Sequence, residues 1–349
     1  MIEFAAAADS SAFDCRALLD RYPASYRCDV ARSRPGACGF SGAVVFQVDV
    51  PAGPCCLRGM PAENVNCQRL SGLHRLIAHI RAQGVKEVAV PIAAGDGTTH
   101  FASEGRIWQL EPWMPGAADF AMRPSRSRLI AAVTSLARWH RAAASFEPSE
   151  AERAWFFQSN SERSPGLAER FREIGRWNNT ALDLVRANLN ASSWKELAEL
   201  ARHILDRFVR AAPRIAARMQ LGLASRVPLQ PCLRDVWHDH ILFMGDEVTG
   251  LIDAHAARSD SVATDLARLL GSLVGDDREA REAAIDAYRQ IRPLTLEELA
   301  LVELFDQSGV LLSGMTWLDW QCLEGRTFEN REKVLARLAE IVSRLDRLR

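Results

Sequence analysis

Lysine is almost missing from this sequence. Of the 43 basic residues in a chain of 349, only Lys86, Lys195 and Lys333 are lysines. Arginine must therefore supply nearly every fixed cation, in binding sites as well as on the surface. An excess of either sign of charge is missing too, since 44 acidic residues leave a net charge of -1. The chain has no overall field to attract nucleic acid or anionic lipid, and we expect neither as a partner.

Long apolar runs and paired cysteine motifs are also absent from the sequence. No stretch approaches the roughly 18 uncharged apolar residues of a membrane span, and residues 1–9 lack the basic and apolar segments of a secretory signal. The eight cysteines form neither a C-x-x-C pair nor zinc-finger spacing, and a chain of this length needs no disulfide framework. We therefore expect a cytoplasmic protein with mostly reduced thiols and no membrane association.

The spacing of the apolar residues predicts two lobes of different kinds. With 48% hydrophobic and 25% charged residues the composition is typical of globular proteins, and the length suits two or three domains. Up to Trp113 the apolar residues form short runs separated by glycine and proline, which indicates strands. A helical period over residues 64–83 is the exception. The expected strands cover residues 28–33, 43–50, 55–60, 88–92 and 107–110.

After Gly116 the helical period dominates the sequence. Thr295 and Glu298 have the spacing of a capping box, which predicts one helix start. Between residues 241 and 252 two short apolar runs flank Gly245-Asp246, which indicates a hairpin. A β-rich lobe therefore precedes a helical lobe that contains one small hairpin. The other expected helices cover residues 126–144, 167–176, 194–219, 263–273, 278–290 and 329–348.

The segment around this hairpin carries a pattern that points to phosphoryl transfer. Leu233-Arg234-Asp235 is followed by His240, and Gly250-Leu251-Ile252-Asp253 ends the hairpin. The arrangement resembles the catalytic loop and metal-binding turn of the protein-kinase-like fold, in the branch of aminoglycoside phosphotransferases and choline kinases. In that pattern an Asp stands five residues before a metal-binding Asn, and a second Asp follows a hairpin. Residues 109–116 resemble the hinge between the lobes, and residues 135–140 resemble the family's L-A-x-x-H helix.

The resemblance implies a two-lobed α+β fold with three parts. Residues 1–108 would form the nucleotide-binding lobe, residues 109–116 the hinge, and residues 117–349 the helical lobe with the catalytic loop and the substrate site. The implied activity is a phosphotransferase that uses ATP, with Mg²⁺ or Mn²⁺, and acts on a hydroxyl group of a small molecule. The sequence predicts neither the identity of the acceptor nor the oligomeric state.

The chemistry of this transfer assigns a role to each residue of the catalytic segment. The reaction needs a carboxylate near the attacking hydroxyl and hard oxygen ligands for the metal. We expect Asp235, with Arg234, to be catalytic, and Asp253 with His240 to bind the metal. Aspartates are also common in ordinary tight turns. The positions of these two on either side of a hairpin favour the catalytic interpretation.

The first lobe contains residues that suit a nucleotide. A glycine turn before the strand at residues 43–50 offers backbone N–H groups to phosphates. On the following strand Arg58 takes the position of the phosphate-binding cation, and a guanidinium binds phosphate oxygens as a fork. The resemblance implies that the adenine lies against residues 109–113. The residues expected at the nucleotide are Gly36, Gly39, Gly42, Arg58, Gln109, Glu111 and Trp113.

Three departures from the family pattern bear on activity. The helix over residues 64–83 contains no carboxylate that could clamp Arg58, and Leu233 stands where the pattern has a His. His240 stands in the position of the metal-binding Asn. Imidazole suits Mn²⁺ and other transition ions better than Mg²⁺. Either the metal preference is altered or one metal site is lost.

Two alternative functions stay open at this stage. The departures allow a catalytically degenerate kinase fold that binds nucleotide or a partner without turnover. In the second alternative, residues 238–240 with Asp253 and His255 gather as ligands of a transition metal in a hydrolase, with both rings of the H-x-H on one face of a strand. Trp317 and Trp320 could form a box for a cationic substrate, but their helical spacing favours a place in the core.

Overall fold

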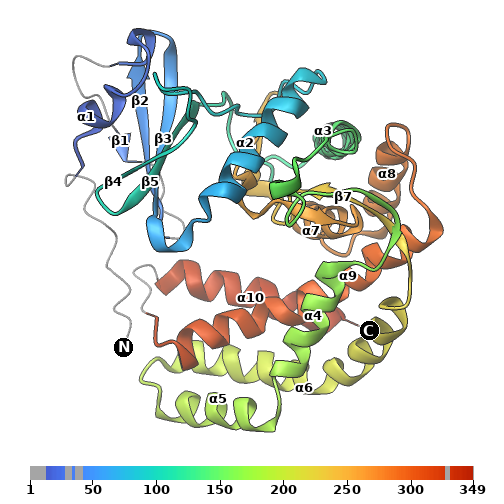
Figure 1. Cartoon of the computed structure of the whole chain (residues 1–349). Helices are drawn as coiled ribbons and strands as arrows, with labels where there is room; N and C mark the ends of the chain where they lie inside the picture. Colours follow the sequence, from blue (N-terminus) through green and yellow to red (C-terminus); the bar gives the residue numbers. More distant parts are fainter. Residues whose placement is uncertain (1–12, 28–33, 36–41, 327–330, 349) are drawn as a thin grey trace. The chain divides into compact units, whose positions relative to one another are not determined.

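The computed structural model describes residues 13–27, 34–35, 42–326 and 331–348, and the chain divides into two compact units (Figure 1). The first unit consists of residues 1–157 and 238–258. The second consists of residues 158–237 and 259–349. A sheet dominates the N-terminal part and helices dominate the C-terminal part, so the predicted α+β class is confirmed.

A five-stranded antiparallel sheet forms the base of the first unit. Its strand order is β1-β2-β3-β5-β4. The short helix α1 (Cys15–Leu19), capped by the carboxylate of Asp14, packs with Tyr22 on the apolar core of the sheet. The strands are β1 (Arg34–Pro35), β2 (Val44–Val50), β3 (Gly53–Pro61), β4 (Phe101–Ser103) and β5 (Arg106–Pro112).

The register of β3 and β5 gathers polar side chains on the face of the sheet opposite this core. Arg58 lies opposite Gln109, and Cys56 lies opposite Glu111. Because successive side chains of a strand point to opposite faces, these four residues share one face. Their neighbours in the chain, Leu57 among them, point into the apolar core.

Two helices and the predicted hairpin complete the first unit. Helix α2 (Cys67–Ala82) begins at Asn66, whose side chain accepts a hydrogen bond from the backbone N–H of Arg69 at 2.9 Å. It packs against α3 (Arg126–Ala143), which also contacts the hairpin. The hairpin consists of β8 (Ile241–Met244) and β9 (Glu247–Leu251). Its turn contains Gly245 with a φ of 60°, which a residue without a Cβ adopts easily.

The expected strand over residues 88–92 is wrong. Val88 makes a single parallel bridge to Leu251, and the rest of the segment is irregular. Pro91 has no N–H to donate to a ladder, and proline is rare within paired strands. The expected strand over residues 28–33 lies outside the described residues, and β4 was not anticipated.

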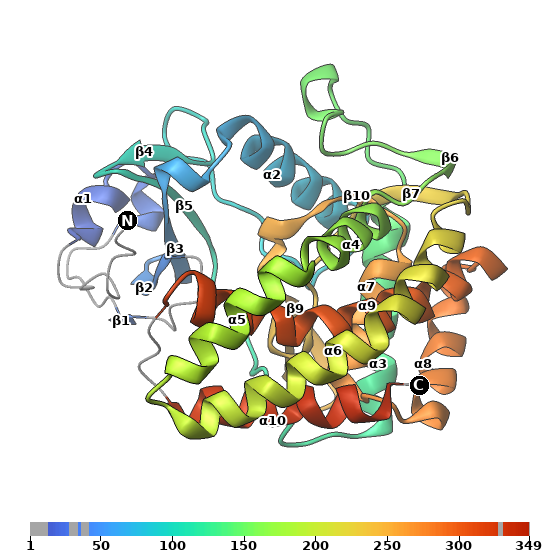
Figure 2. The same ribbon diagram turned by 90° about the horizontal axis from the view of Figure 1, so that it is seen from below.

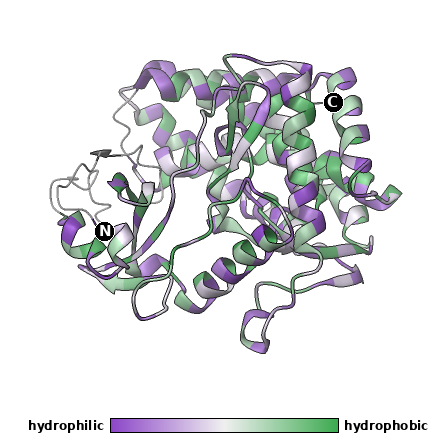
Figure 3. Ribbon diagram, turned by 90° about the horizontal axis from the view of Figure 1, so that it is seen from above, coloured by the Kyte–Doolittle hydropathy of each residue, from purple (hydrophilic) through white to green (hydrophobic). Residues whose placement is uncertain are grey.

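The second unit is helical around a small sheet of three strands in the order β10-β7-β6. Helix α9 contacts α4, α6, α7 and α10, and α6 also contacts α5 and α10 (Figure 2). Hydrophobic and hydrophilic segments alternate along the helices of the ribbon (Figure 3), as is typical of helices that pack on one face. The strands are β6 (Ser159–Glu162), β7 (Val227–Cys232) and β10 (Arg258–Asp260). The helices are α4 (Pro165–Arg176), α5 (Asn179–Ala191), α6 (Lys195–Gly222), α7 (Ala263–Leu273), α8 (Arg278–Arg289), α9 (Leu296–Leu318) and α10 (Arg331–Arg347).

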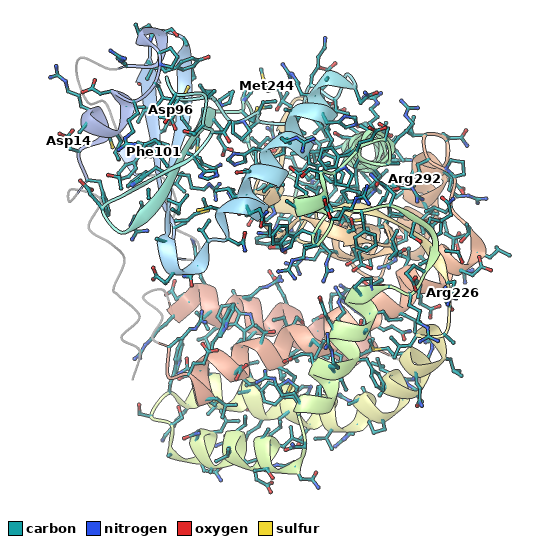
Figure 4. The ribbon with its side chains drawn as sticks, in the orientation of Figure 1. Asp14, Asp96, Phe101, Arg226, Met244 and Arg292 are labelled. Carbon is teal, nitrogen blue, oxygen red and sulfur yellow. The ribbon has the colours of Figure 1, made fainter. Side chains whose placement is uncertain are left out.

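The start of α9 confirms the predicted capping box. The backbone N–H of Glu298 donates to the Thr295 hydroxyl at 3.1 Å, and the Glu298 carboxylate accepts from the Thr295 N–H at 2.9 Å. Arg292, labelled in Figure 4, donates to the same carboxylate at 2.8 Å and to the Gln230 side chain at 3.2 Å. The cap therefore also ties β7 to the helical part of this unit.

The predicted helices are otherwise confirmed, but α5 and the strands β6, β7 and β10 were not anticipated. Trp317 and Trp320 stack edge to face, with ring centroids 5.4 Å apart, and both are half-buried rather than core residues. The six described cysteines are free thiols. In the described part of the chain, no helix is long and apolar enough to span a membrane. Short helical turns cover Ala24–Tyr26, Ala62–Asn64, Glu150–Glu152, His238–His240, Ala254–Ala256 and Asp319–Leu323.

Candidate active site

Arg58 on β3 is the centre of a charged group in the first unit. Its Nη1 donates a hydrogen bond to Asp253 Oδ1 at 3.3 Å, and its Nη2 lies 4.0 Å from Glu111 Oε1. The predicted phosphate-binding cation and the predicted metal ligand are thus in contact, although 195 residues separate them in the chain. Glu111 supplies the carboxylate that α2 lacks.

Two carboxylates keep this half-buried guanidinium charged. Burial alone lowers the pKa of Arg58, but the charges of Glu111 and Asp253 outweigh it, and the net shift of the pKa is upward. Among the described residues, no acceptor reaches the buried Arg58 Nε.

Asp253 follows β9 in a left-handed backbone conformation, with φ 60° and ψ 53°. Asp tolerates this region better than most residues. The carboxylate faces Arg58, the His255 Nδ1 at 3.2 Å and the His240 Nε2 at 3.8 Å. Burial raises its pKa, but these neighbours lower it further, to well below its usual range. Asp253 therefore stays ionised, as a ligand of a divalent cation must.

Gln109 links α2 to this charged group. Its side-chain N–H donates to Glu111 at 3.2 Å, and its carbonyl oxygen lies 3.2 Å from both His74 Nε2 and His255 Nε2. The Nδ1 of His74 lies 2.6 Å from the Thr99 hydroxyl. Burial lowers the pKa of His74 to about 3, so this ring is neutral. Gln109 is only 1% exposed, and its side chain belongs to this network rather than to an open surface.

A small cavity lies beside this network. Its volume is ≈ 20 Å³, enough for about one water molecule. Such a space suits a water or a single ion rather than a nucleotide base. The cavity is lined by Leu73, His74, Ile77, Val88, Ala89, Gln109, Glu111, Trp139, Leu251, Ile252, Asp253, Ala254 and His255.

The structure describes only some of the other residues that were expected at the nucleotide. Gly36 and Gly39 lie outside the described residues. Gly42 adopts a φ of 70°, and its carbonyl accepts a hydrogen bond from Arg106 at 2.9 Å. Trp113 follows β5 and is 36% exposed, with its backbone N–H bonded to the carbonyl of Pro54 at 3.0 Å.

The predicted catalytic loop belongs to the second unit, where a buried acid holds its backbone. The N–H groups of Leu233 and Arg234 donate to the two oxygens of the Asp265 carboxylate, each at 2.7 Å. Arg234 has a φ of 68°, an unusual conformation for a long side chain that costs about 1–3 kcal/mol. Its guanidinium binds Asp260 at 2.9 Å and Glu169 at 2.5 Å. Together these contacts fix the backbone conformation of the turn that precedes Asp235.

Asp235 itself is half-exposed and bound to an arginine of α7. Arg268 Nε donates to Asp235 Oδ1 at 2.8 Å, and Nη2 lies 2.5 Å from the same oxygen. The side chains are 45% and 41% exposed. Arg268 stands one helical turn after Asp265, so one face of α7 holds both the backbone and the carboxylate of the loop.

The histidine segment does not have the predicted strand geometry. Residues 238–240 form a 3₁₀ turn, so the expectation of two rings on one strand face is wrong. His238 Nε2 lies 3.4 Å from Asp239, whereas His240 and His255 both approach Asp253. Asp253 is thus the carboxylate that both of these imidazole rings approach.

Sequence reasoning missed three residues that shape these groups. Asp265 could have been found as an acid in the first turn of a strongly apolar helix, 12 residues after Asp253. Glu111 was expected at the nucleotide, and strand alternation places it on the face of Arg58. No local signal indicated the contacts of His74 and Arg268, because their partners are distant in the chain.

Comparison with known proteins places these observations in a family. A sequence model of the phosphotransferase enzyme family (APH) matches residues 34–302. A homoserine kinase of Methylobacterium nodulans is 34% identical over 145 residues, covering 38% of this chain and 44% of that protein. One of Janthinobacterium is 26% identical over 255 residues, covering 71% and 69%. The chain spans about half the length of the first curated relatives it matches, 44% and 56% for two of them.

Solved structures show the same fold at low sequence identity. An aminoglycoside phosphotransferase of Alicyclobacillus acidocaldarius superposes with a TM-score of 0.59 at 18% identity, covering 95% of this chain and 97% of that one. A spectinomycin phosphotransferase, solved with ADP and spectinomycin, gives a TM-score of 0.60 at 12% identity, covering 92% and 93%. The fold predicted from the sequence is therefore confirmed.

Proposed function

Because the chain belongs to the phosphotransferase enzyme family, we propose that it transfers the terminal phosphoryl group of ATP to a hydroxyl group of a small molecule. The contact of Arg58 with Asp253 carries this proposal, because phosphoryl transfer needs a cation for the phosphates beside an oxygen ligand for a metal. Arg58 lies on the third strand of the sheet, and Asp253 lies in the turn after the hairpin.

Arg58 would bind the phosphate oxygens of the nucleotide, with Glu111 holding the guanidinium. Asp253 and His240 would hold a divalent cation, either Mg²⁺ or Mn²⁺, which neutralises charge on the phosphates when bound. A related amicoumacin kinase was solved with AMP-PNP and Ca²⁺, which supports the use of a nucleotide with a divalent ion.

Asp235 would accept the hydrogen bond of the attacking hydroxyl and orient it. A carboxylate in this role has to be accessible, and the side chain of Asp235 is 45% exposed. Arg234 would fix the turn before Asp235 through its ion pairs with Asp260 and Glu169. The relatives named homoserine kinases make an amino-acid alcohol the first acceptor to test.

The test is the release of ADP from ATP in the presence of small alcohols, amino-acid alcohols, amino sugars and nucleosides. The wild type should turn over with at least one acceptor, and Asp235→Asn should lose most of that rate. Asp286→Asn serves as the matched control, since Asp286 lies on α8 and is 74% exposed. Equal rates for the wild type and Asp235→Asn would show that the catalytic loop is assigned wrongly.

A further inference from the structure

A side chain of helix α2 holds the backbone that follows Asp253. Arg69, in the first turn of α2, donates through its Nη2 to the backbone carbonyls of His255 and Ala257, the second at 3.1 Å. These carbonyls belong to the short helical turn over residues 254–256 and to the residue that ends it. One guanidinium group therefore ties the turn after the proposed metal ligand to α2.

The backbone on the other side of Asp253 is held by the hairpin. The N–H of Ile252 donates to the carbonyl of His240 at 3.0 Å. Asp253 itself has a φ of 60°, a left-handed conformation that persists in a residue other than glycine only where the surrounding structure fixes it. The hairpin fixes the backbone before this residue, and Arg69 fixes the backbone after it.

No ion pair explains the position of Arg69. In the part of the chain that the structure describes, its guanidinium has the two carbonyls as acceptors and no carboxylate within 4.0 Å. Burial lowers the pKa of Arg69, and the positive charge of Arg258 lowers it further. A half-buried cation beside a like charge needs acceptors to replace its lost water. The two carbonyls therefore keep the guanidinium at this turn.

A second contact joins α2 to the same turn. The Nε2 of His74, five residues further along the helix, lies 3.2 Å from the side-chain oxygen of Gln109, and the Nε2 of His255 lies 3.2 Å from the same oxygen. Helix α2 therefore reaches the turn directly through Arg69, and through Gln109 from His74.

The helix is a firm support for these contacts. The backbone N–H of Arg69 is itself the group that the Asn66 side chain caps, at 2.9 Å. The helix is also anchored by apolar side chains that it buries, so a displacement of α2 would move the guanidinium with it. These buried residues are Leu70, Leu73, Leu76, Ile77 and Ile80.

Phosphoryl transfer in this fold needs the helix, the phosphate-binding cation and the metal carboxylate in place together. A carboxylate on the helix would make the link by pairing with the cation, but residues 64–83 contain none. We propose that Arg69 is the positioning residue that replaces it, by linking α2 to the metal-binding turn rather than to Arg58. This role rests on the proposed function, because it concerns the metal ligand of that site. Metal binding at Asp253 and the position of α2 then depend on each other.

Hydrogen exchange of the full chain without metal or nucleotide tests the contact. The amide of Ala257 donates to the Ala254 carbonyl at 2.9 Å, so its exchange reports opening of the turn. Arg69→Met keeps the aliphatic stem and removes the donors, and exchange over residues 254–258 should become about tenfold faster. Arg69→Lys keeps the charge and one donor nitrogen and should lie between this variant and the wild type. Arg81→Met is the control, because Arg81 is exposed near the end of the same helix, and it should exchange as the wild type does. Unchanged exchange in Arg69→Met would overturn the inference.

Calorimetry separates positioning of the metal ligand from a merely structural contact. The affinity for AMP-PNP, measured with Mn²⁺ and again with EDTA, gives the factor by which the metal strengthens binding. Loss of a partner that orients a metal ligand typically costs roughly 10–100-fold in affinity, so this factor should fall about tenfold in Arg69→Met and stay within about twofold in Arg81→Met. Equal factors in the wild type and Arg69→Met would overturn the inference, even where exchange is faster.

The same measurements distinguish this role from the proposed function. If the factor falls in Arg69→Met while the wild type transfers no phosphate to any acceptor, the proposed function fails and the role of Arg69 stands. If the wild type releases ADP with an acceptor while the two factors are equal, the function stands and the role of Arg69 fails. A wild type whose affinity does not change with Mn²⁺ has no metal at Asp253, which would also overturn the inference.

Discussion

Replacing Asp265 by Asn should release the catalytic loop while preserving the shape of the side chain. The carboxylate accepts two hydrogen bonds, from Leu233 N and Arg234 N, each at 2.7 Å. An amide offers one oxygen and one NH₂ group, so one of the two N–H donors would face another donor. The loss of one charge-assisted hydrogen bond costs roughly 1.5–3 kcal/mol. The unusual φ of Arg234 then loses part of its support.

The loss should be visible as faster hydrogen exchange in peptides that contain residues 233–235. A cost of about 2 kcal/mol corresponds to about 30-fold faster exchange where exchange proceeds through local opening. In the activity assay kcat should fall by about 10²-fold, since Asp235 is no longer held in place. Asp286→Asn should change neither quantity. Unchanged exchange at these residues in Asp265→Asn would refute the view that Asp265 holds the loop.

Three further predictions concern the first unit. The pKa of His74 is about 3 in the folded state and 6.5 in the unfolded chain, so the unfolded state binds more protons below pH 6.5. The free energy of unfolding should therefore fall by about 2 kcal/mol between pH 7 and pH 5. Melting curves recorded over this pH range should show a smaller decrease for His74→Gln. Gly59→Ala places a Cβ 2.7 Å from the Trp108 ring and should cost about 1–3 kcal/mol in urea unfolding, whereas Gly175→Ala, with no heavy atom within 4 Å, should not destabilise. His240→Asn should shift the metal preference of ATP turnover from Mn²⁺ toward Mg²⁺; identical preferences in both proteins would show that His240 is not a ligand.

The helical period predicted most of the helices, because amphipathic helices packed on one face carry that period in their sequence. Helix α7 and the predicted 263–273 agree at both ends. Helix α5 was missed although Asn178 caps it and Leu182, Val185 and Leu189 have helical spacing. The sequence therefore contained the signal of a helix here, but the segment was not interpreted as one.

The small sheet of the second unit could not be read from local sequence. Strand β7 contains Pro228 and Pro231, which argue against a strand when taken alone. The strand is stabilised by partners far away in the chain, at β6 and β10. At residues 88–92 the error was the opposite one: an apolar run was predicted to be a strand, but the segment does not pair with a second strand along its length.

The resemblance implied that Arg58 binds the phosphates and that Asp253 binds the metal, but the direct contact between these residues, 195 positions apart, was not predicted. Neither the resemblance nor any spacing in the sequence predicted the ion pair of Asp235 with Arg268. Gln109 was expected at the adenine, and strand alternation would instead have placed it on the face of Arg58. Local pattern therefore predicted the elements, and the partners within each group came from packing.

The most direct test of phosphoryl transfer is ³¹P NMR on samples taken from a reaction of the purified protein with ATP, Mn²⁺ and L-homoserine, after the paramagnetic Mn²⁺ has been removed on a chelating resin. The account predicts a phosphate monoester signal that grows at the same rate as ADP, and that disappears in Asp235→Asn. Growth of inorganic phosphate alone, or a spectrum of ATP that does not change with any acceptor of the panel, would contradict it.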